Sequence, residues 1–332
     1  MSLTAWTTTF SSDATHIIFA QFGIQVKEKN QSLQYVKTIT ESFQLPNGPN
    51  HFDLSVFVDS ESYHNHLFMA YWKNPQNYQA WLNHPHVQKW CSGNLIDKHS
   101  EVGFFSEVAT IPITHFETIH SRNNNDSGVT NFTSLEETKT HAYWGSMRDR
   151  IPVSASSDLK GEYGNKLILK EKETFGKRIK VMAPNNLCLI RTAQDWSHCS
   201  EEQKKTYLNL IQPALNKAHR FLENHPDDTG CISARLIQEI DSDGKRLEKT
   251  SVIGYFQSLY HLERWTHEHA THKALFGTFA EMLKRHNFNV DLSLWHEVSV
   301  LQSKDLELEY VNCHPKTGFL PFFETNEVSI VY

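Results

Sequence analysis

Hydrophobic and polar residues recur along the chain with two different periods, and each period predicts one type of element. Runs rich in β-branched and aromatic residues, bounded by polar turns, are typical of strands. Such runs occupy Ile17–Gln25, Leu54–Val58, Leu67–Trp72, Lys166–Glu171, Ile179–Met182, Leu187–Thr192, Ile232–Glu239, Ser251–Phe256 and Leu292–Leu301. Apolar residues spaced three and four positions apart predict helices. Helical spacing occupies Gln31–Phe43, Pro75–Asn83, Glu201–Glu223, Tyr260–His267 and Thr271–Lys284. The chain is therefore predicted to mix strands and helices.

Two stretches share an order of residues that indicates an internal repeat. They are FMAYWKNPQNYQAWLNHPH, which begins at Phe68, and VIGYFQSLYHLERWTHEHATH, which begins at Val252. Each reads as a strand, an aromatic pair, a turn, a helix with one Trp and a His-rich turn. We interpret this as duplication of a ferredoxin-like module. It predicts one domain, residues 1–332, with pseudo-repeats at about 17–120 and 140–318 and a linker or mobile loop at 121–137.

Charge and hydropathy exclude several partners. Lys and Arg number 32 against 38 Asp and Glu, a net charge of −6, so there is no basic field for nucleic acid. No run approaches 18 apolar residues, and the N-terminal stretch lacks the pattern of a signal peptide. We therefore expect no membrane partner and a cytoplasmic protein. The five cysteines form no CxxC pair, which favours reduced thiols over disulfides or a zinc ribbon.

Histidine is abundant, at 20 of 332 residues, and one histidine lies on an apolar strand face. In LSLWHEVSVL, alternation places His296 with Leu292, Leu294, Val298 and Val300. Two interpretations remain open from this pattern. His296 is either a core histidine bonded to a backbone carbonyl or a general acid and base in a dry pocket.

A second histidine candidate lies on a predicted helix. Trp265, His269, His272, Phe276, Phe279 and Leu283 recur at intervals of three and four, which places both histidines on the apolar stripe. A buried imidazole among aromatic residues suits an axial haem ligand, whereas a histidine at a helix end also serves as a cap or surface contact. A zinc helix is not supported, because no frame of HEHATH matches the motif HExxH.

Three further residues are candidates for a site. Thr192 shares an apolar strand face with Cys188 and Ile190, so its hydroxyl bonds either the backbone or a ligand. Arg150 is either part of a local ion pair or a fork of donors for an oxygen-bearing group. Glu117 follows Ile111 and Ile113 on the same alternation, as a buried carboxylate or as the polar end of a strand.

These residues lie in segments that resemble the haem-containing aldoxime dehydratases, which convert an aldoxime to a nitrile and water. The segments keep the family's order from about Phe19 to Gly318: LPNGPNHFDLSVFVDS, YWKNPQNYQAW, HFETIH, HAYWGSMRDRIP, IRTAQDWS, LERWTHEHATHKALF, LWHEVSVL and YVNCHPKTG. The resemblance implies an α+β fold of the dimeric α+β barrel type, with two ferredoxin-like repeats, antiparallel sheets and a haem pocket between sheet and helices. It also implies haem b, ferrous in the active state, an aldoxime substrate and a homodimer.

The resemblance assigns a role to each candidate. His272 falls at the proximal haem ligand and His296 at the distal catalytic histidine. Arg150 matches a distal arginine, Glu117 a distal acid, and Thr192 a distal serine of better-known members. The implied reaction is an elimination in which ferrous iron binds the oxime nitrogen. In it, Thr192 and Arg150 orient the oxime hydroxyl while His296 delivers a proton to it and then accepts the proton from the aldoxime carbon.

The chain departs from the family's pattern at a few positions. Thr192 keeps the serine hydroxyl but adds a methyl group, Ala270 stands in place of Pro, and Ala142 stands in place of Gly. His269 is the alternative iron ligand if the alignment is shifted by one helical turn. Three other functions remain open. The protein is another haem enzyme of the same architecture, peroxidase-like or chlorite-decomposing, or a non-enzymatic protein that binds haem or another small ligand, or a metal-free ferredoxin-like interaction protein, which would leave His296 and Thr192 without a role.

Overall fold

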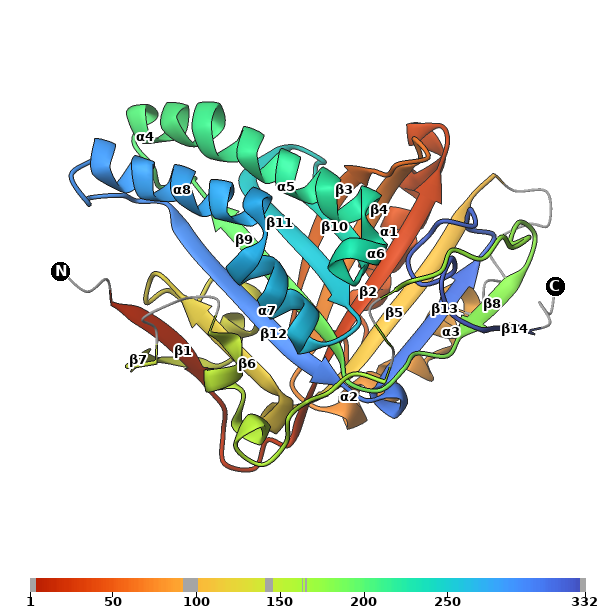
Figure 1. Cartoon of the computed structure of the whole chain (residues 1–332). Helices are drawn as coiled ribbons and strands as arrows, with labels where there is room; N and C mark the ends of the chain where they lie inside the picture. The colour runs from red at the N-terminus through yellow and green to blue at the C-terminus, as the bar shows by residue number, and fades with distance from the viewer. Residues whose placement is uncertain (1–3, 92–100, 141–145, 163, 165, 329–332) are drawn as a thin grey trace.

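The computed structural model describes residues 4–91, 101–140, 146–162, 164 and 166–328 (Figure 1). Its strands are β1 (Ala5–Thr9), β2 (His16–Val26), β3 (His51–Val58), β4 (His64–Trp72), β5 (Gly103–Pro112), β6 (Phe116–His120), β7 (Ser134–Thr138), β8 (Arg178–Val181), β9 (Leu187–Asp195), β10 (Cys231–Ile240), β11 (Arg246–Phe256), β12 (Ser293–Leu301), β13 (Leu306–Val311) and β14 (Thr325–Val328). Its helices are α1 (Leu33–Phe43), α2 (Pro75–Leu82), α3 (Pro85–Cys91), α4 (Glu201–Thr206), α5 (Gln212–Asn224), α6 (Pro226–Thr229), α7 (Leu259–Glu268) and α8 (Ala270–Arg285). The fold is α+β.

All the described strands join one antiparallel sheet of 14 strands, in the order β14-β8-β13-β5-β2-β4-β3-β10-β11-β9-β12-β6-β1-β7. Two groups of four strands at its centre have the same connectivity. The first runs β2, α1, β3, β4, α2, β5, and the second runs β9, α4 and α5, β10, β11, α7 and α8, β12. The first group is arranged β5-β2-β4-β3 and the second β10-β11-β9-β12, which is the same order of equivalent strands read in reverse. The groups meet where β3 pairs with β10.

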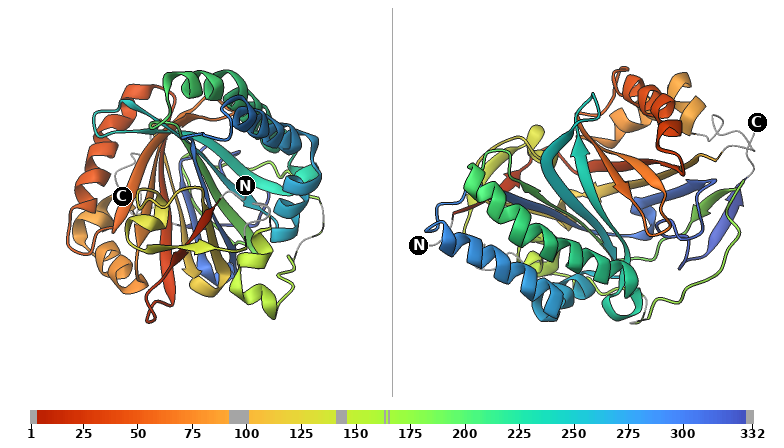
Figure 2. Two further views of the ribbon diagram at one scale, coloured as in Figure 1. Left: turned by 90° about the vertical axis from the view of Figure 1, so that its left-hand side faces the viewer. Right: turned by 90° about the horizontal axis from the view of Figure 1, so that it is seen from above.

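The helices lie on the outer faces of the sheet in two separate sets (Figures 1 and 2). Helices α1 to α3 pack on the first group of strands, while α5, α7 and α8 pack on β9, β11 and β12. The inner faces of both groups contribute to one shared core, in which Phe19 and Tyr71 from the first group join Leu189 and Tyr255 from the second. Both faces of the central strands are therefore buried, which explains their high content of large apolar side chains.

Most predicted elements are confirmed, with ends that differ by a few residues. The predicted helix Glu201–Glu223 comprises α4, a π-helical turn over Tyr207–Ile211, and α5. Pro213 lies in the first turn of α5, and because proline has no N–H to donate, the hydrogen-bond ladder changes at this point. None of the helices in the described part of the chain is both long and apolar enough to cross a membrane.

The strand predicted at Lys166–Glu171 is wrong. These residues are not part of any strand, and Ile168 and Leu169 are 71% and 67% exposed. One backbone bond, from Lys170 N–H to the carbonyl of Pro321, fixes the segment to the rest of the protein. Strand propensity reports how well a residue fits a pleated surface, and here no neighbouring strand supplies that surface.

The segment 121–137 differs from the predicted linker or mobile loop. It contains a 3-10 turn at Gly128–Asn131 and most of β7, which pairs with β1. The single alternation from Ile111 through Ile113 to Glu117 is also wrong, because a 3-10 turn at Ile113–His115 separates β5 from β6. The sequence analysis listed no strand for β1, β5, β6, β7, β13 or β14. The largest omission is β5, a ten-residue and mostly buried strand between β13 and β2.

Candidate functional site

A cavity of about 330 Å³ lies between the second group of strands and its helices. The sheet side is formed by β9, β11 and β12, and the helix side by α5, α7 and α8. The equivalent space in the first half is filled by a cluster of aromatic side chains, among them Phe22, Phe43, Trp72, Trp81 and Trp90. Of the two helix–sheet layers with the same connectivity, the second therefore keeps a space for a ligand and the first is filled.

His272 enters this cavity from the helix side. It lies in the first turn of α8, and its Nδ1 is 2.9 Å from the carbonyl oxygen of Thr266. A carbonyl only accepts, so Nδ1 carries the proton and Nε2 keeps its lone pair for a metal. Burial lowers the pKa of His272, against the opposing effect of the Thr266 carbonyl, and this favours the neutral imidazole that a metal requires.

His269 does not share this position, although the helical spacing placed both histidines on one stripe. The helix ends at Glu268 and a new one begins at Ala270, so His269 caps α8 and its side chain accepts a hydrogen bond from Thr271 N–H. Its ring stacks on Trp265, with centroids 4.5 Å apart, and does not line the cavity. The geometry therefore favours His272 over His269 as the ligand.

Opposite His272, three of the predicted residues meet at the sheet. His296 on β12 lines the cavity, and its Nε2 is 2.8 Å from Glu117 Oε1 on β6. Arg150 donates from Nε to Glu117 Oε2 at 2.8 Å, and its Nη2 lies 3.3 Å from His296 Nε2. Glu117 and Arg150 are almost fully buried, with 1% and 4% of their side chains exposed. The three side chains form one buried charged cluster at the edge of the cavity.

Glu117 is held in its ionised form by its partners. Burial alone would raise the pKa of this carboxyl, but the charges of His296 and Arg150 and the hydrogen bonds they donate lower it below the usual value. The Glu117 carboxylate accepts a hydrogen bond from His296 when Nε2 carries a proton. Arg150 Nη2, as a donor, suits His296 when Nε2 is unprotonated. The same ring nitrogen thus has an acceptor and a donor within reach, one for each protonation state.

Thr192 lies directly beside His296. The two residues are opposite one another in the β9–β12 pairing, and both side chains line the cavity. Among the residues that the structure describes, the Thr192 hydroxyl makes one long hydrogen bond, 3.4 Å to the carbonyl of Trp295. Because that bond is weak, the hydroxyl is available to a ligand on the sheet side of the cavity.

Comparison with known proteins identifies the family. The model of the haem-containing dehydratase family matches residues 20–319. The chain belongs to this family. It is 52% identical to a phenylacetaldoxime dehydratase of Bacillus sp. strain OxB-1 over 98% of this chain and 93% of that protein. It is 34% identical to an aliphatic aldoxime dehydratase of Pseudomonas chlororaphis, over 95% of this chain and 90% of that protein.

Solved structures of aldoxime dehydratases also match this haem-containing dehydratase. A crystal structure of an aldoxime dehydratase in complex with butyraldoxime has a TM-score of 0.88 at 31% identity, covering 96% of this chain and 89% of that chain. A second aldoxime dehydratase structure has a TM-score of 0.87 at 33% identity, covering 96% and 90%. The fold and the sequence therefore identify the same family.

The cavity fits the family's cofactor. Haem needs a largely apolar cavity and a neutral histidine whose second nitrogen is held by an acceptor. The Thr266 carbonyl holds Nδ1 of His272, so His272 provides the neutral histidine. The apolar lining includes Ile190, Leu222, Trp265 and Phe279. Haem is thus the cofactor expected between α8 and the sheet, and His272 is the residue that would hold its iron.

The sequence analysis missed a buried network behind the site. On the opposite face of the sheet, Glu297 accepts a hydrogen bond from the Tyr71 hydroxyl, and Arg191 donates to the same hydroxyl. Arg191 also pairs with Asp53 and Glu239. Arg191 and Glu297 directly adjoin Thr192 and His296 in sequence, so the network holds both strands that carry site residues. Ala142, one departure from the family pattern, lies outside the described residues.

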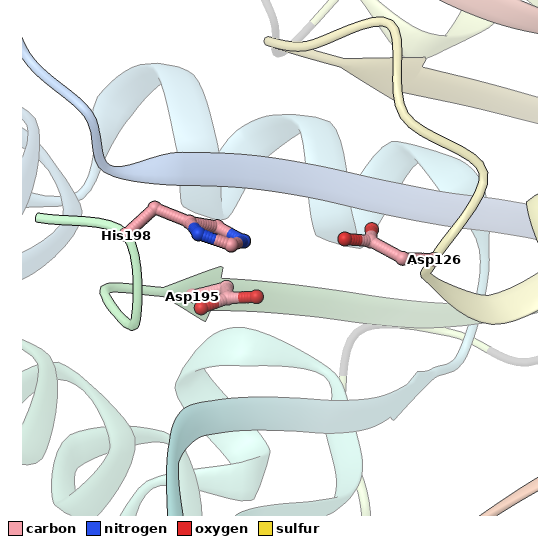
Figure 3. A group of neighbouring side chains, drawn as sticks. All are labelled: Asp126, Asp195 and His198. Atoms are coloured by element: carbon pink, nitrogen blue, oxygen red, sulfur yellow. The ribbon is translucent and has the colours of Figure 1, made fainter.

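A separate group of possible metal ligands lies at the end of β9 (Figure 3). In Asp126, Asp195 and His198, one ligand atom of each lies within 4.8 Å of the others. Asp195 already has partners: Ser197 donates two hydrogen bonds to it, and Lys249 Nζ is 3.2 Å from its second oxygen. The group is therefore satisfied as a charged network at the surface.

Proposed function

We propose that this haem-containing dehydratase removes water from aldoximes, R–CH=N–OH, to give nitriles. The observation that carries the proposal is the position of His296, whose Nε2 lies between the Glu117 carboxylate and the Arg150 guanidinium and beside Thr192. The names of the relatives support the same reaction, and the relative at 52% identity supports an arylalkyl aldoxime such as phenylacetaldoxime as substrate. Dehydration needs one group that both gives and takes a proton, and His296 suits this role.

The residues of the chain divide the work as follows. His272 holds the iron. Haem held there would supply a ferrous iron able to bind and polarise the oxime group. Thr192 and Arg150 hydrogen-bond the oxime hydroxyl and fix its direction. His296, protonated and stabilised by Glu117, donates its proton to the hydroxyl as the N–O bond breaks and water leaves.

The second proton transfer returns the enzyme to its first state. Neutral His296 accepts the proton from the aldoxime carbon, and the electrons of that C–H bond complete the triple bond of the nitrile. While His296 is neutral, Arg150 donates a hydrogen bond to its unprotonated Nε2. Once His296 is protonated again, Nε2 donates a hydrogen bond to Glu117. Each cycle therefore consumes one aldoxime and releases one nitrile and one water, with no net change in protons or electrons.

We further propose that the two groups of strands are ferredoxin-like modules of the dimeric α+β barrel type. Their shared connectivity and strand order support this. The pseudo-repeats at about 17–120 and 140–318 form a single haem-binding catalytic domain over residues 1–332. The functional protein is a homodimer, which light scattering on the haem-loaded protein tests directly.

An absorption spectrum tests the reaction. The purified protein is loaded with haem, reduced with dithionite under anaerobic conditions and mixed with phenylacetaldoxime. We expect a shift of the Soret band on addition of substrate and formation of phenylacetonitrile in the same cuvette. His296→Ala should keep haem and lose turnover, whereas His269→Ala should keep both. Turnover of peroxide or chlorite without nitrile formation would refute the proposal, and so would a protein that does not bind haem.

A further inference from the structure

We infer that Glu297 is a positioning residue for His296, and that residue 128 is a glycine because the Glu297 carboxylate needs its space. Glu297 follows His296 on β12 and faces the opposite side of the sheet, where it is buried. It fastens the segment after β6 to β12 and thereby fixes Glu117 against His296. The inference rests on the proposed function, because it concerns how the group that transfers protons in that reaction is oriented.

Strand β6, which carries Glu117, is short and lies near one end of the sheet. It has five residues and pairs with β12 on one side. On its other side it is joined to β1 by one register pair, Trp6 with His120, and by a hydrogen bond from Thr8 N–H to Thr118. Short elements near an edge open more easily than central ones, so the contact of Glu117 with His296 depends on what else holds β6.

The segment after β6 returns to β12 and supplies this second attachment. Ser121 N–H donates to the carbonyl of Leu294, and Leu294 N–H donates to the Ser121 hydroxyl. Farther along, Val129 N–H donates to Glu297 Oε1 at 2.8 Å. The continuous segment 117–129 therefore contacts two consecutive residues of β12 from opposite faces: Glu117 meets His296 on the cavity face, and Val129 meets Glu297 on the inner face.

The Glu297 carboxylate has a second partner in the first half of the molecule. Its Oε2 accepts a hydrogen bond from the Tyr71 hydroxyl on β4, at 2.7 Å. Val129, like Tyr71, belongs to the fully buried core that both halves share. One carboxylate thus holds the segment, β12 and β4 together, directly behind the strand position that carries His296.

Gly128 is shaped by this contact. Its φ of +51° is one that glycine adopts at little cost. A Cβ at this position would lie 2.0 Å from Oε1 and 2.8 Å from Cδ of Glu297. Conformation alone would also permit asparagine, but the approach of the carboxylate leaves no room for any side chain.

Gly128→Ala tests the inference with Glu297 still present. The added methyl group collides with the flexible end of a side chain, so the fold should survive while the carboxylate leaves Val129 and Tyr71. We expect kcat for phenylacetaldoxime to fall about ten- to a hundredfold, as when a catalytic group is misplaced by roughly 1 Å. The Kd of the aldoxime, measured by the Soret shift of the reduced haem protein, should stay close to the wild-type value.

The matched control is Gly176→Ala. Gly176 also has a positive φ, of +70°, but an added Cβ there meets nothing within 4 Å. The control therefore introduces the same kind of backbone strain without touching Glu297, and kcat should stay at the wild-type value. Equal kcat values for the two alanine variants would overturn the inference, and so would loss of haem from Gly128→Ala alone.

Glu297→Gln breaks the same contact from the other side and serves if Gly128→Ala does not fold. Both partners of the carboxylate donate, and an amide has one oxygen to accept, so one of the two bonds is lost. This variant should also lower kcat. Combined with Gly128→Ala it should add no further loss, because both substitutions remove one interaction. Multiplied losses in the double variant would mean that the residues act separately, against the inference.

The carbon monoxide complex of the reduced haem protein supplies a readout other than turnover. Its C–O stretching frequency depends on the hydrogen-bonding and charged groups near the bound gas, among which we expect His296. The frequency should shift in Gly128→Ala and in Glu297→Gln but not in Gly176→Ala. A lower kcat with an unchanged frequency would make Glu297 a stabilising residue only. If the wild-type protein forms no nitrile, the proposed reaction fails, and these frequencies still decide whether Glu297 positions His296.

Discussion

At the scale of single residues, two histidines three positions apart have different environments because one helix ends just before His269 and the next begins just after it. His269 caps α8 and stacks on Trp265, while His272 enters the cavity with its Nδ1 bonded to the Thr266 carbonyl. The spacing of apolar residues predicted both histidines on one stripe of a single helix, because such spacing does not show where one helix ends and the next begins. The group that orients His272 is the backbone carbonyl of Thr266. Every residue has such a carbonyl, so the sequence does not indicate this contact.

His272→Ala should abolish retention of haem. The substitution removes the imidazole whose Nε2 keeps a lone pair for the iron, and the rest of the cavity supplies mostly apolar contact. Haem per chain after gel filtration, read from the Soret band, measures the effect, and added imidazole should restore part of it. His269→Ala is the control and should stay loaded. A haem-replete, fully active His272→Ala protein would contradict the assignment.

Thr192→Ala should lower kcat/KM by roughly ten- to a thousandfold, the scale of losing one hydrogen bond made in the transition state. The hydroxyl lies beside His296 and makes only a 3.4 Å bond to the Trp295 carbonyl, so the folded protein loses little with it. Thr192→Ser keeps the hydroxyl, removes only the methyl group and should keep most of the activity. Kinetics of the alanine variant equal to those of the wild type would make Thr192 a packing residue.

At the scale of elements, the two groups of strands carry related buried networks on their inner faces. Tyr71 on β4 contacts Arg191 and Glu297, which are paired across β9 and β12. Tyr255 on β11, the tyrosine at the same place in the repeated sequence, accepts from Gln21, which is paired with Glu107 across β2 and β5. The similarity between FMAYW and VIGYF in sequence is therefore accompanied by a similar arrangement of buried polar partners around Tyr71 and Tyr255.

Tyr71→Phe should destabilise the protein by about 1–3 kcal/mol. The lost hydroxyl accepts from Arg191 and donates to Glu297, and both groups would stay buried with one partner fewer. Urea unfolding of the haem-free protein, followed by circular dichroism, measures the change. Tyr78→Phe also removes a hydroxyl from a buried tyrosine, but no described hydrogen bond involves it, so its effect should be small. Equal unfolding midpoints for the two variants would contradict a role for the network.

The sequence predicted most of the central strands and helices, with β5 as an exception, but it did not predict which elements contact one another. Alternation placed His296 on the cavity face because β12 is a regular strand, and it placed Glu117 correctly only by coincidence, since a 3-10 turn interrupts the pattern. The cluster of His296, Glu117 and Arg150 joins three segments that are distant in sequence. The spacing of apolar residues shows which side chains share one face of a single helix or strand. Contacts between elements depend on the order of strands in the sheet, which this spacing does not show. The resemblance to a known family grouped these residues instead.

At the scale of the whole molecule, one half carries the site and the other half supports it. The first helix–sheet layer is filled by aromatic rings, while the second holds the cavity. The shared inner core and the Tyr71 network connect the two halves. The molecule thus combines one densely packed helix–sheet layer with a second layer that contains a cavity, and the shared core joins the two.

Burial also leaves several histidines uncharged, which makes the folded molecule sensitive to acid. Burial lowers the pKa of His120 to about 3, helped by the charge of His296, and lowers the pKa of His66, His219 and His261 to about 4. The unfolded chain takes up these protons near pH 6.5 and the folded protein only at its lower pKa values. The free energy of unfolding therefore falls as pH decreases below about 6.5, by up to about 1.4 kcal/mol per pH unit for each histidine.

His120→Phe should reduce this dependence on pH. His120 stacks on Trp295, and its Nε2 has no hydrogen-bond partner among the described residues, so a phenyl ring keeps the stacking and removes a buried polar atom. We expect equal or higher stability at pH 7 and a shallower decline of the urea midpoint between about pH 6.5 and pH 4. The exposed His86 provides the control, because His86→Phe should leave the slope unchanged. An unaltered slope in His120→Phe would mean that water reaches Nε2 and that other groups cause the acid sensitivity.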